Sequence, residues 1–507
     1  MVSETGDDSR RAGRGLLWVT GAKVFFVVSS TVIWAILPRI FDDEAVFGLF
    51  AVAFGFASII TAVLISSTLQ TVSKLVSENE ERAPAVLRQG LRIQLVVGSV
   101  VGSLLFFGAP LLVRWWFEDQ AFVPILRLAG AVAVAYALYA TLVGYLNGQR
   151  RFDRQAQLDM TFGVLRSVGI LGGAALGAGA FGAFGGFSAA SGIILVVALA
   201  FVGWGAPGEG LPARRWLTFL VPIMAYQAAL NGLLQIDLQV LHGTVAGMAT
   251  EQGIEAPEEL AARLSGFYRA AQMFAFVPYQ LILSVTLVVF PMISRATSIG
   301  DEQAARSYVR NALRFSFLVL LSIATPIAGS ARGVLGVVYT DSYLLGSSAL
   351  QILVFGQVAF ALFVIASTIV AGGGRPMRSA SVALFAVIVV VVAVYAGVRI
   401  AGLHGDRPLV ATAIGTSIGT SVALLAVGTI VYRTFGTFLP PLSAVRGTVA
   451  GVAAFGCAHV IPHDTVLGAM AALAGGFFAY GAVLVVLREL SANDLAILRR
   501  ILGRQRT

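Results

Sequence analysis

Apolar residues follow one another along this chain in long runs, separated by short polar segments that are rich in arginine. Most runs are roughly 20 residues long, the length that crosses the hydrocarbon core of a bilayer as a helix. The pattern predicts an all-α polytopic membrane protein with about fourteen spanning helices. Their expected ranges are 15–37, 46–69, 89–113, 122–147, 158–179, 182–204, 215–247, 263–291, 308–331, 346–371, 379–402, 408–432, 444–461 and 465–487.

Composition agrees with this prediction. Of the 507 residues, 57% are hydrophobic and only 12% are charged, whereas soluble proteins carry about a quarter charged residues. The apolar run after the polar start is too long for a signal peptide, so we expect it to remain as the first helix. Because the chain has a single cysteine, Cys457, no intramolecular disulfide is expected.

The distribution of positive charge predicts how the helices are oriented. With the N-terminus in the cytoplasm, the cytoplasmic segments hold 25 of the 35 Lys and Arg residues and the opposite segments hold eight, with Lys23 and Arg166 inside spans. Positive charge near helix ends stays on the cytoplasmic side. The asymmetry therefore favours fourteen helices with both termini cytoplasmic, and the net charge of +9 indicates orientation in a membrane, with no nucleic-acid partner.

Two segments of the chain are repeated. Residues 46–56 and 264–274 share a Gly-x-aromatic-x-x-Ala motif at a separation of 218 residues, and residues 133–152 match 357–377 at a separation of 224. The expected second and fourth helices thus resemble the eighth and tenth, and the partners run in the same direction. Parallel repeats of this kind are a transporter architecture with alternating access. Only the second copy of the first motif contains an arginine, Arg269.

The repeat also predicts the domain organisation. We expect a cytoplasmic N-terminal tail at 1–14, a six-helix N-lobe at 15–205, a six-helix C-lobe at 214–433, two further helices at 442–488 and a basic tail at 489–507. The composition of the last segment is that of an amphipathic helix lying on an anionic cytoplasmic leaflet.

Several segments resemble those of a known family. They are PRIFDDEAVFGLFAVAF (38–54), LNGLLQIDLQVL (230–241), GFYRAAQ (266–272), VVFPMIS (288–294), ARGVLGVVYTDSY (331–343) and AGGGR (371–375). Together they are similar to the polysaccharide-biosynthesis (oligosaccharide) flippase family, which shares a superfamily with lipid II flippases and multidrug exporters. The resemblance implies transport of a lipid-diphosphate-linked saccharide from the inner to the outer leaflet of a bacterial cytoplasmic (inner) membrane.

Two cations, Lys23 and Arg166, lie inside the expected spans, and a third, Arg269, counted above with the opposite side, lies close to the outer end of the expected eighth helix. A charge near the middle of the bilayer costs roughly 2.5–3.5 kcal/mol, so it usually faces a cavity or a partner. Lys23, Arg166 and Arg269 are therefore candidate ligands for a diphosphate, and a guanidinium suits it best because it donates two parallel hydrogen bonds. The structural alternatives are headgroup contacts for Lys23 and Arg269, and for Arg166 an ion pair with Asp159 or a side chain that reaches the headgroups.

The expected seventh and eighth helices carry neutral polar side chains. Gln227, Asn231 and Gln235 lie near one another by helical spacing, and Gln272 shares a face with Arg269. Amides suit sugar hydroxyls because they both donate and accept hydrogen bonds. Asp237 is a carboxylate well inside a span and suits a coupling proton or sodium ion. The alternative is that these groups hold the seventh helix to its neighbours.

No pattern indicates catalysis, a cofactor or a metal. The chain shows no paired carboxylates, no nucleophile constellation and no Walker-type loop, so we do not expect an enzyme. The GAGAFG segment at 177–182 joins two expected helices and follows no strand, which argues against a dinucleotide cofactor. His459 and His463 are interrupted by Pro462 and do not indicate a metal site.

Together with these observations, the family resemblance implies an ion-coupled flippase for an undecaprenyl-diphosphate-linked oligosaccharide destined for surface polysaccharide. The expected partners are this carrier lipid, the bilayer, H⁺ or Na⁺, a polysaccharide polymerase and glycosyltransferases. Three alternatives stay open: a lipid II flippase, a multidrug cation exporter and a non-transporting scaffold of a glycan-synthesis complex. The exporter needs carboxylates to bind cationic drugs, whereas the interior of this chain holds three cations, counting Arg269, against Asp237.

Overall fold

The protein is built from helices throughout the part of the chain that the structure describes. A computed structural model describes residues 4–114, 119–373 and 375–489, with the side chains of 4–20, 23, 281–288, 290, 291 and 376 left out. Contacts divide the chain into two units, Met1–Arg269 and Ala270–Thr507, and each is described by itself.

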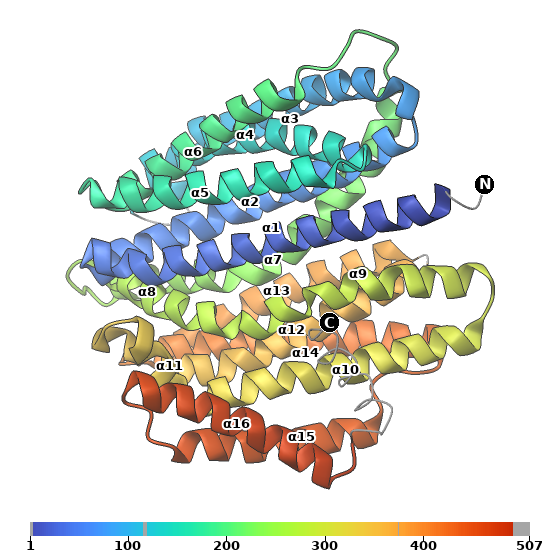
Figure 1. Cartoon of the computed structure of the whole chain (residues 1–507). Helices are drawn as coiled ribbons and strands as arrows, with labels where there is room; N and C mark the ends of the chain where they lie inside the picture. Colours follow the sequence, from blue (N-terminus) through green and yellow to red (C-terminus); the bar gives the residue numbers. More distant parts are fainter. Residues whose placement is uncertain (1–3, 115–118, 374, 490–507) are drawn as a thin grey trace. The chain divides into compact units, whose positions relative to one another are not determined.

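The first unit contains seven complete helices and most of an eighth (Figure 1). They are α1 (Glu4–Phe41), α2 (Glu44–Ser77), α3 (Ala83–Leu112), α4 (Phe122–Gly148), α5 (Phe152–Ala175), α6 (Gly179–Val202), α7 (Ala213–Glu251) and α8 (Pro257–Ala275), with a short 3₁₀ turn, η1 (Glu80–Arg82), before α3. In this unit α4 packs against α2, α3 and α6, α1 packs against α5, and α7 packs along α2.

The second unit contains the remaining helices. They are α9 (Val277–Ser298), α10 (Glu302–Gly329), α11 (Ala331–Val338), η3 (Asp341–Gly346), α12 (Ser347–Gly372), α13 (Pro376–Ala401), α14 (Arg407–Phe435), α15 (Pro441–Val460) and α16 (Val466–Val486). Here α12 is central, packing against α9, α10, α13 and α14, while α15 and α16 pack together against α10.

The central helix of each unit carries one copy of the second repeated segment. Residues 133–152 lie mostly in α4, and the matching residues 357–377 lie mostly in α12. Within its own unit, α4 contacts α2, α3, α5 and α6, and α12 contacts α9, α10, α11, α13 and α14. Equivalent sequence therefore occupies an equivalent place, as expected for a parallel repeat.

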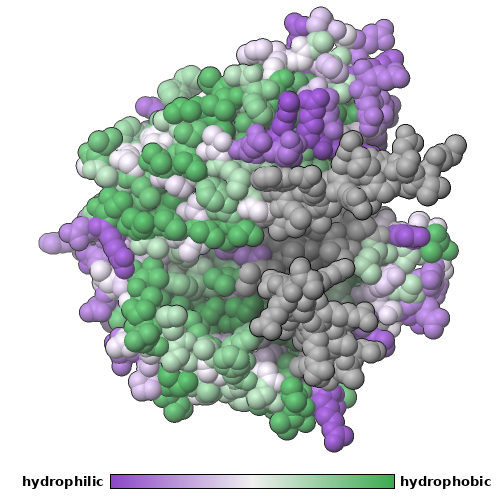
Figure 2. All heavy atoms as spheres, in the orientation of Figure 1, coloured by the Kyte–Doolittle hydropathy of each residue, from purple (hydrophilic) through white to green (hydrophobic). Residues whose placement is uncertain are grey.

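The surface and helix lengths agree with a membrane-spanning protein. Twelve of the described helices are long and apolar enough to cross a bilayer. Figure 2 shows hydrophobic residues along the sides of the helices and hydrophilic residues gathered toward helix ends. Of the expected fourteen spans, the fifth corresponds to α5, which carries Asp159 and Arg166 and is not among the twelve.

The structure corrects the expected eighth helix. Residues 263–291 do not form one helix, because α8 ends at Ala275 and α9 begins at Val277. Pro278 lies in the first turn of α9, where the absence of a backbone N–H costs no helical hydrogen bond. The expected lobes at 15–205 and 214–433 stay a prediction. The division by contacts falls at a different place, since it groups α7 with the helices that precede it.

A cytoplasmic tail was expected at each end of the chain. The expected N-terminal tail, 1–14, overlaps α1, which begins at Glu4. Most of the expected amphipathic tail, 489–507, lies outside the described residues. Its first residue, Glu489, is described and is buried at the end of α16: its carboxylate accepts hydrogen bonds from Arg314 Nε of α10 (2.7 Å) and Arg446 Nη1 of α15 (3.2 Å).

Candidate functional site

One face of α1 contacts Arg166 and Arg269, the two buried arginines among the described side chains of the first unit. Phe26, Ser30 and Trp34 follow one another at intervals of four residues, so they share a face of the helix. Arg166 of α5 donates from Nη2 to Ser30 Oγ, and its Cζ lies 4.0 Å from the centre of the Phe26 ring. Arg269 of α8 lies farther along the same face, with its Cζ 4.2 Å from the centre of the Trp34 ring.

Arg269 is enclosed by α1 and α7. Its side chain is 8% exposed, and its Nη1 donates to Gln235 Oε1 of α7 at 3.3 Å. A guanidinium over an aromatic face gains up to about 2 kcal/mol when it is desolvated. Trp34 and Gln235 therefore offset part of the cost of keeping this cation away from water.

A small cavity lies beside Arg166. Its volume is about 40 Å³, and its lining residues come from α1, α2 and α5: Ser30, Ile33, Trp34, Phe50, Phe54, Arg166 and Ile170. The buried Nε of Arg166 makes no hydrogen bond with any described residue. Because one water needs roughly 10–15 Å³ measured this way, the cavity has room for about two or three waters. Trp34 lines this cavity and also contacts Arg269, so it stands between the two cations.

Asp237 is paired with the residue that precedes Arg269. The hydroxyl of Tyr268 donates to Asp237 Oδ2 at 2.8 Å, and the backbone N–H of Leu238 donates to Oδ1 at 2.8 Å. Asp237 is 1% exposed and Tyr268 is fully buried. Five residues farther along α7, His242 Nδ1 lies 3.3 Å from Ser265 Oγ of α8. The polar residues of α7 and α8 thus meet in pairs across the helical hairpin.

The predicted amides occupy different environments. Gln235 binds Arg269, as described, whereas Asn231 donates to the backbone carbonyl of Gln227 in its own helix at 2.9 Å. Gln227 is half-buried, and Gln272 is fully buried in α8. Of the four predicted amides, Gln235 is the one whose hydrogen bond to the arginine is described here.

Some residues of the site were not predicted as ligands. Tyr268, Ser30 and Trp34 contact the charged groups directly. Ser30 and Trp34 had one available signal, since they share a face of the expected first helix with Lys23. Gln239 was also missed: its amide donates to the backbone carbonyl of Val52 at 3.0 Å and joins α7 to α2.

The predictions for Lys23 and for an ion pair of Arg166 have different outcomes. The side chain of Lys23 is outside the described part of the chain, so its role stays a prediction. The expected ion pair between Arg166 and Asp159 is not among the ion pairs of the described side chains, and Asp159 accepts a hydrogen bond from the Tyr139 hydroxyl at 3.1 Å. No cluster of three or more His, Cys, Asp or Glu residues that could hold a metal is found among the residues that the structure describes.

Comparison with known sequences identifies one family. Residues 12–297, more than half of the chain, match the profile of a family described as polysaccharide biosynthesis protein. Among curated protein sequences, none matches this chain significantly.

Solved structures with the same fold are membrane transporters. The chain is similar to the lipid II flippase MurJ in an inward closed conformation, with a TM-score of 0.74, 14% identity, and coverage of 94% of this chain and 99% of MurJ. It is also similar to an inward-facing multidrug resistance MATE family transporter of the MOP superfamily, with a TM-score of 0.64, 17% identity, and coverage of 82% of this chain and 96% of that transporter.

A third similar structure is a MOP superfamily transporter from Pyrococcus furiosus Vc1, described as having a binding pocket of reverse polarity that suggests a different function. Its TM-score is 0.60 at 16% identity, with coverage of 83% of this chain and 95% of that one. At these identities the likeness establishes the fold, which is the one that MOP superfamily transporters share.

Proposed function

The chain belongs to the polysaccharide biosynthesis protein family, and on this premise we propose that it is a flippase for an undecaprenyl-diphosphate-linked oligosaccharide. In this proposal the cargo moves from the inner to the outer leaflet of the bacterial cytoplasmic membrane by alternating access. Both termini are cytoplasmic, and the chain acts with a polysaccharide polymerase and glycosyltransferases. The reaction is transport, with no covalent step.

The observation that carries this proposal is the buried guanidinium of Arg269. It lies within a helix bundle of membrane-spanning length and is held by an aromatic ring and an amide. A cation inside a membrane usually faces a substrate path or a partner. A guanidinium donates two parallel hydrogen bonds to a phosphate, which gives it both affinity and orientation for a diphosphate.

The other candidate residues receive supporting roles in this proposal. Lys23 and Arg166 supply further positive charge for the diphosphate, and Gln227, Asn231, Gln235 and Gln272 bind sugar hydroxyls. Asp237 is the site at which H⁺ or Na⁺ couples to transport. Asp237 accepts a hydrogen bond from Tyr268, which precedes Arg269 in the chain. This contact supports the role, because a change of charge at Asp237 would alter the hydrogen bond of a residue adjacent to the proposed phosphate ligand.

A lipid II flippase is the second candidate. The similarity to MurJ over nearly the whole of both chains favours it, and both candidate cargoes present a diphosphate to the protein. A multidrug cation exporter is disfavoured because the described charges of the site are two arginines and one carboxylate. A non-transporting scaffold would have no need for these buried charges.

The test is the leaflet distribution of polyprenyl-diphosphate-linked saccharides in cells that lack this gene. We expect an undecaprenyl-diphosphate-linked oligosaccharide to accumulate on the inner leaflet, with one surface polysaccharide missing and peptidoglycan intact. Accumulation of lipid II with lysis would instead identify the second candidate. If neither lipid changed, the flippase proposal would be wrong.

A further inference from the structure

The segment that connects α6 to α7 is fixed on the first turns of α3. Gly205 has φ +73° and the backbone N–H of Ala206 donates to the carbonyl oxygen of Pro84 at 3.2 Å. A Cβ atom at Gly205 would overlap that same carbonyl oxygen. Both the positive φ and the close approach therefore require glycine here, and they hold the connection against α3.

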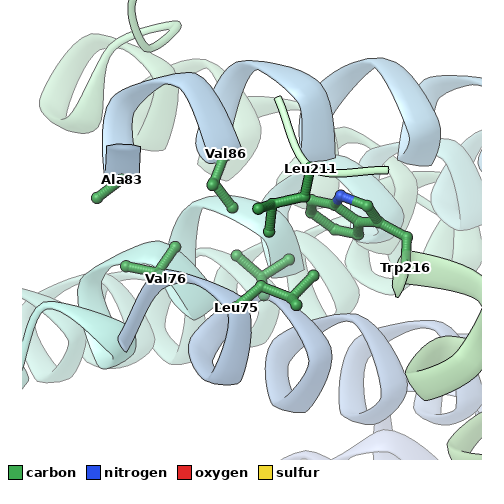
Figure 3. Close-up of a cluster of buried hydrophobic side chains, with 7 residues drawn as sticks. Leu75, Val76, Ala83, Val86, Leu211 and Trp216 are labelled. Atoms are coloured by element: carbon green, nitrogen blue, oxygen red, sulfur yellow. The ribbon is translucent and has the colours of Figure 1, made fainter. Parts of the chain in front are cut away.

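Gln89 of α3 fixes the other end of the connection. Its amide pairs with the backbone of Leu211 on both sides: Nε2 donates to the carbonyl oxygen, and Oε1 accepts from the N–H, each at 2.7 Å. The indole N–H of Trp216, in the first turn of α7, donates to the same Oε1 at 3.2 Å. Figure 3 shows Leu211 and Trp216 packed with side chains at the end of α2 and the start of α3.

A pocket of about 310 Å³ lies between the connection and α3. Its lining residues are Ala85, Arg88, Gln89, Arg92, Ala206, Pro207, Gly208 and Gly210. The two arginines are the only charged residues among them. Because they are four residues apart in α3, they lie on the same face of the helix and repel each other.

Three nearby basic residues form ion pairs, whereas these two arginines form none with the described residues. Lys74 and Arg215 both pair with Glu78, at 3.7 and 2.9 Å. Arg82 lies 3.9 Å from Glu209. Arg88 and Arg92 make no ion pair or side-chain hydrogen bond with a described residue. The pocket thus presents two positive charges that this part of the protein leaves uncompensated.

We propose that this pocket binds a phosphate group, carried by the headgroup of an anionic phospholipid. Two guanidinium groups on one helix face provide the paired donors that a phosphate accepts. The helix belongs to a candidate membrane span, Glu80–Leu112, and the pocket lies near its start, where we expect lipid headgroups. Anionic headgroups attract such basic residues at a membrane surface.

Binding at this pocket stabilises the attachment of α7 to the bundle formed by α1–α6. The phosphate would neutralise the repulsion between Arg88 and Arg92 and contact a pocket wall that Gln89 joins to Leu211 and Trp216. A ligand that binds only the folded state raises its stability. This site involves none of the residues assigned to cargo, so it stands independently of the proposed transport.

The experiment compares two double variants of the full-length protein in lipid nanodiscs. Arg88→Gln with Arg92→Gln removes the proposed phosphate ligands, and Arg82→Gln with Arg214→Gln removes two charges from the same end of the unit outside the pocket. Thermal unfolding is followed by tryptophan fluorescence in phosphatidylcholine alone and with increasing phosphatidylglycerol. We expect phosphatidylglycerol to raise the Tm of the unsubstituted protein and of the control by several degrees, with saturation, and to leave the Tm of the Arg88/Arg92 variant nearly unchanged.

A second measurement and a soluble probe complete the test. Mass spectrometry of the intact protein should show one fewer retained phosphatidylglycerol per chain for the Arg88/Arg92 variant. If that variant does not fold, Arg92→Gln alone should weaken the lipid response without loss of protein. The soluble probe is millimolar inorganic phosphate, added to the protein in detergent. If it raised the Tm of the unsubstituted protein but not that of the Arg88/Arg92 variant, free phosphate would be identified as the source. An equal lipid response in both double variants would overturn the proposal.

Discussion

Gly48 of α2 and Gly266 of α8 lie against each other's helices at equivalent positions of a repeated segment. A Cβ atom on Gly48 would overlap the carbonyl oxygen of Ala262, and one on Gly266 would lie 2.9 Å from the carbonyl oxygen of Glu44. Glu44 and Ala262 are themselves separated by the repeat distance of 218 residues. The two contacts are therefore reciprocal, and the close crossing of α2 and α8 brings the backbone beside Tyr268 and Arg269 into the first unit.

Substitution of Gly48 by alanine should disturb this crossing. Because the added methyl group meets backbone and has no flexible side chain to displace, we expect a loss of about 1–3 kcal/mol of stability, seen as a lower Tm and less folded protein in the membrane. Gly247→Ala in α7 is the matched control, since nothing lies within 4 Å of its added Cβ. The reciprocal contact would be unimportant if both variants had the same Tm.

Arg269→Ala should abolish most transport while the amount of inserted protein stays unchanged. A charge-assisted hydrogen bond is worth about 1.5–3 kcal/mol, so we expect transport to fall by roughly ten-fold or more. Arg269→Lys keeps the charge but loses the planar fork, and an intermediate rate should result. The measurement is transport of the lipid-linked saccharide in reconstituted vesicles.

Arg263→Ala provides the control for this series. Arg263 lies in the same helix, is exposed and pairs with Glu259 at 3.2 Å. We expect transport by this variant to be unchanged. Wild-type transport by the Arg269→Ala protein would remove Arg269 from the cargo site.

Asp237→Asn should flatten the dependence of transport on the ion gradient. The amide oxygen can still accept the hydrogen bond from Tyr268, while the titratable charge and the acceptor of the Leu238 N–H are lost. Transport should then be measured with and without an imposed H⁺ or Na⁺ gradient.

Tyr268→Phe separates the carboxylate's charge from its positioning. Loss of the hydroxyl leaves a buried carboxylate with one donor fewer, at a cost of about 1–3 kcal/mol, so we expect a lower Tm with gradient dependence retained. If Asp237→Asn kept the full gradient dependence, the coupling site would lie elsewhere.

Glu489 should make the end of α16 sensitive to acid. Burial opposes its ionisation, but hydrogen bonds from Ser443, Arg314 and Arg446 outweigh burial and hold the pKa of this carboxyl below its ordinary value of 4.5. A lowered carboxyl pKa stabilises the folded protein fully above the ordinary pKa, and this stabilisation is lost as the pH falls through the folded-state pKa.

Glu489→Gln isolates this contribution. We expect the unsubstituted protein to have the higher Tm at pH 7 and the difference between the two proteins to shrink progressively below about pH 4.5. Tm values measured from pH 7 to pH 3 check this expectation. A difference that is independent of pH would show that the carboxylate's charge does not hold α16 to α10 and α15.

The sequence predicted the membrane class and most helices for a local reason. A segment that crosses a bilayer must satisfy its backbone hydrogen bonds internally, so an apolar run of sufficient length already determines a helix. The break between α8 and α9 at Phe276 was not predicted, because the apolar run continues through it. Arg269 and Asp237 could be selected as candidates because a charge inside an apolar run is costly wherever the helix lies.

The partners of these charges were decided only by the tertiary structure. Helical periodicity shows which residues share a face, but not which other helix that face meets. Nothing local joins Trp34 to Arg269, or Gln235 to the same guanidinium, because these contacts depend on how α1, α7 and α8 pack. The repeat identified Gly48 and Gly266 as equivalent residues, whereas their reciprocal contact required the close approach of two helices that lie 218 residues apart in sequence.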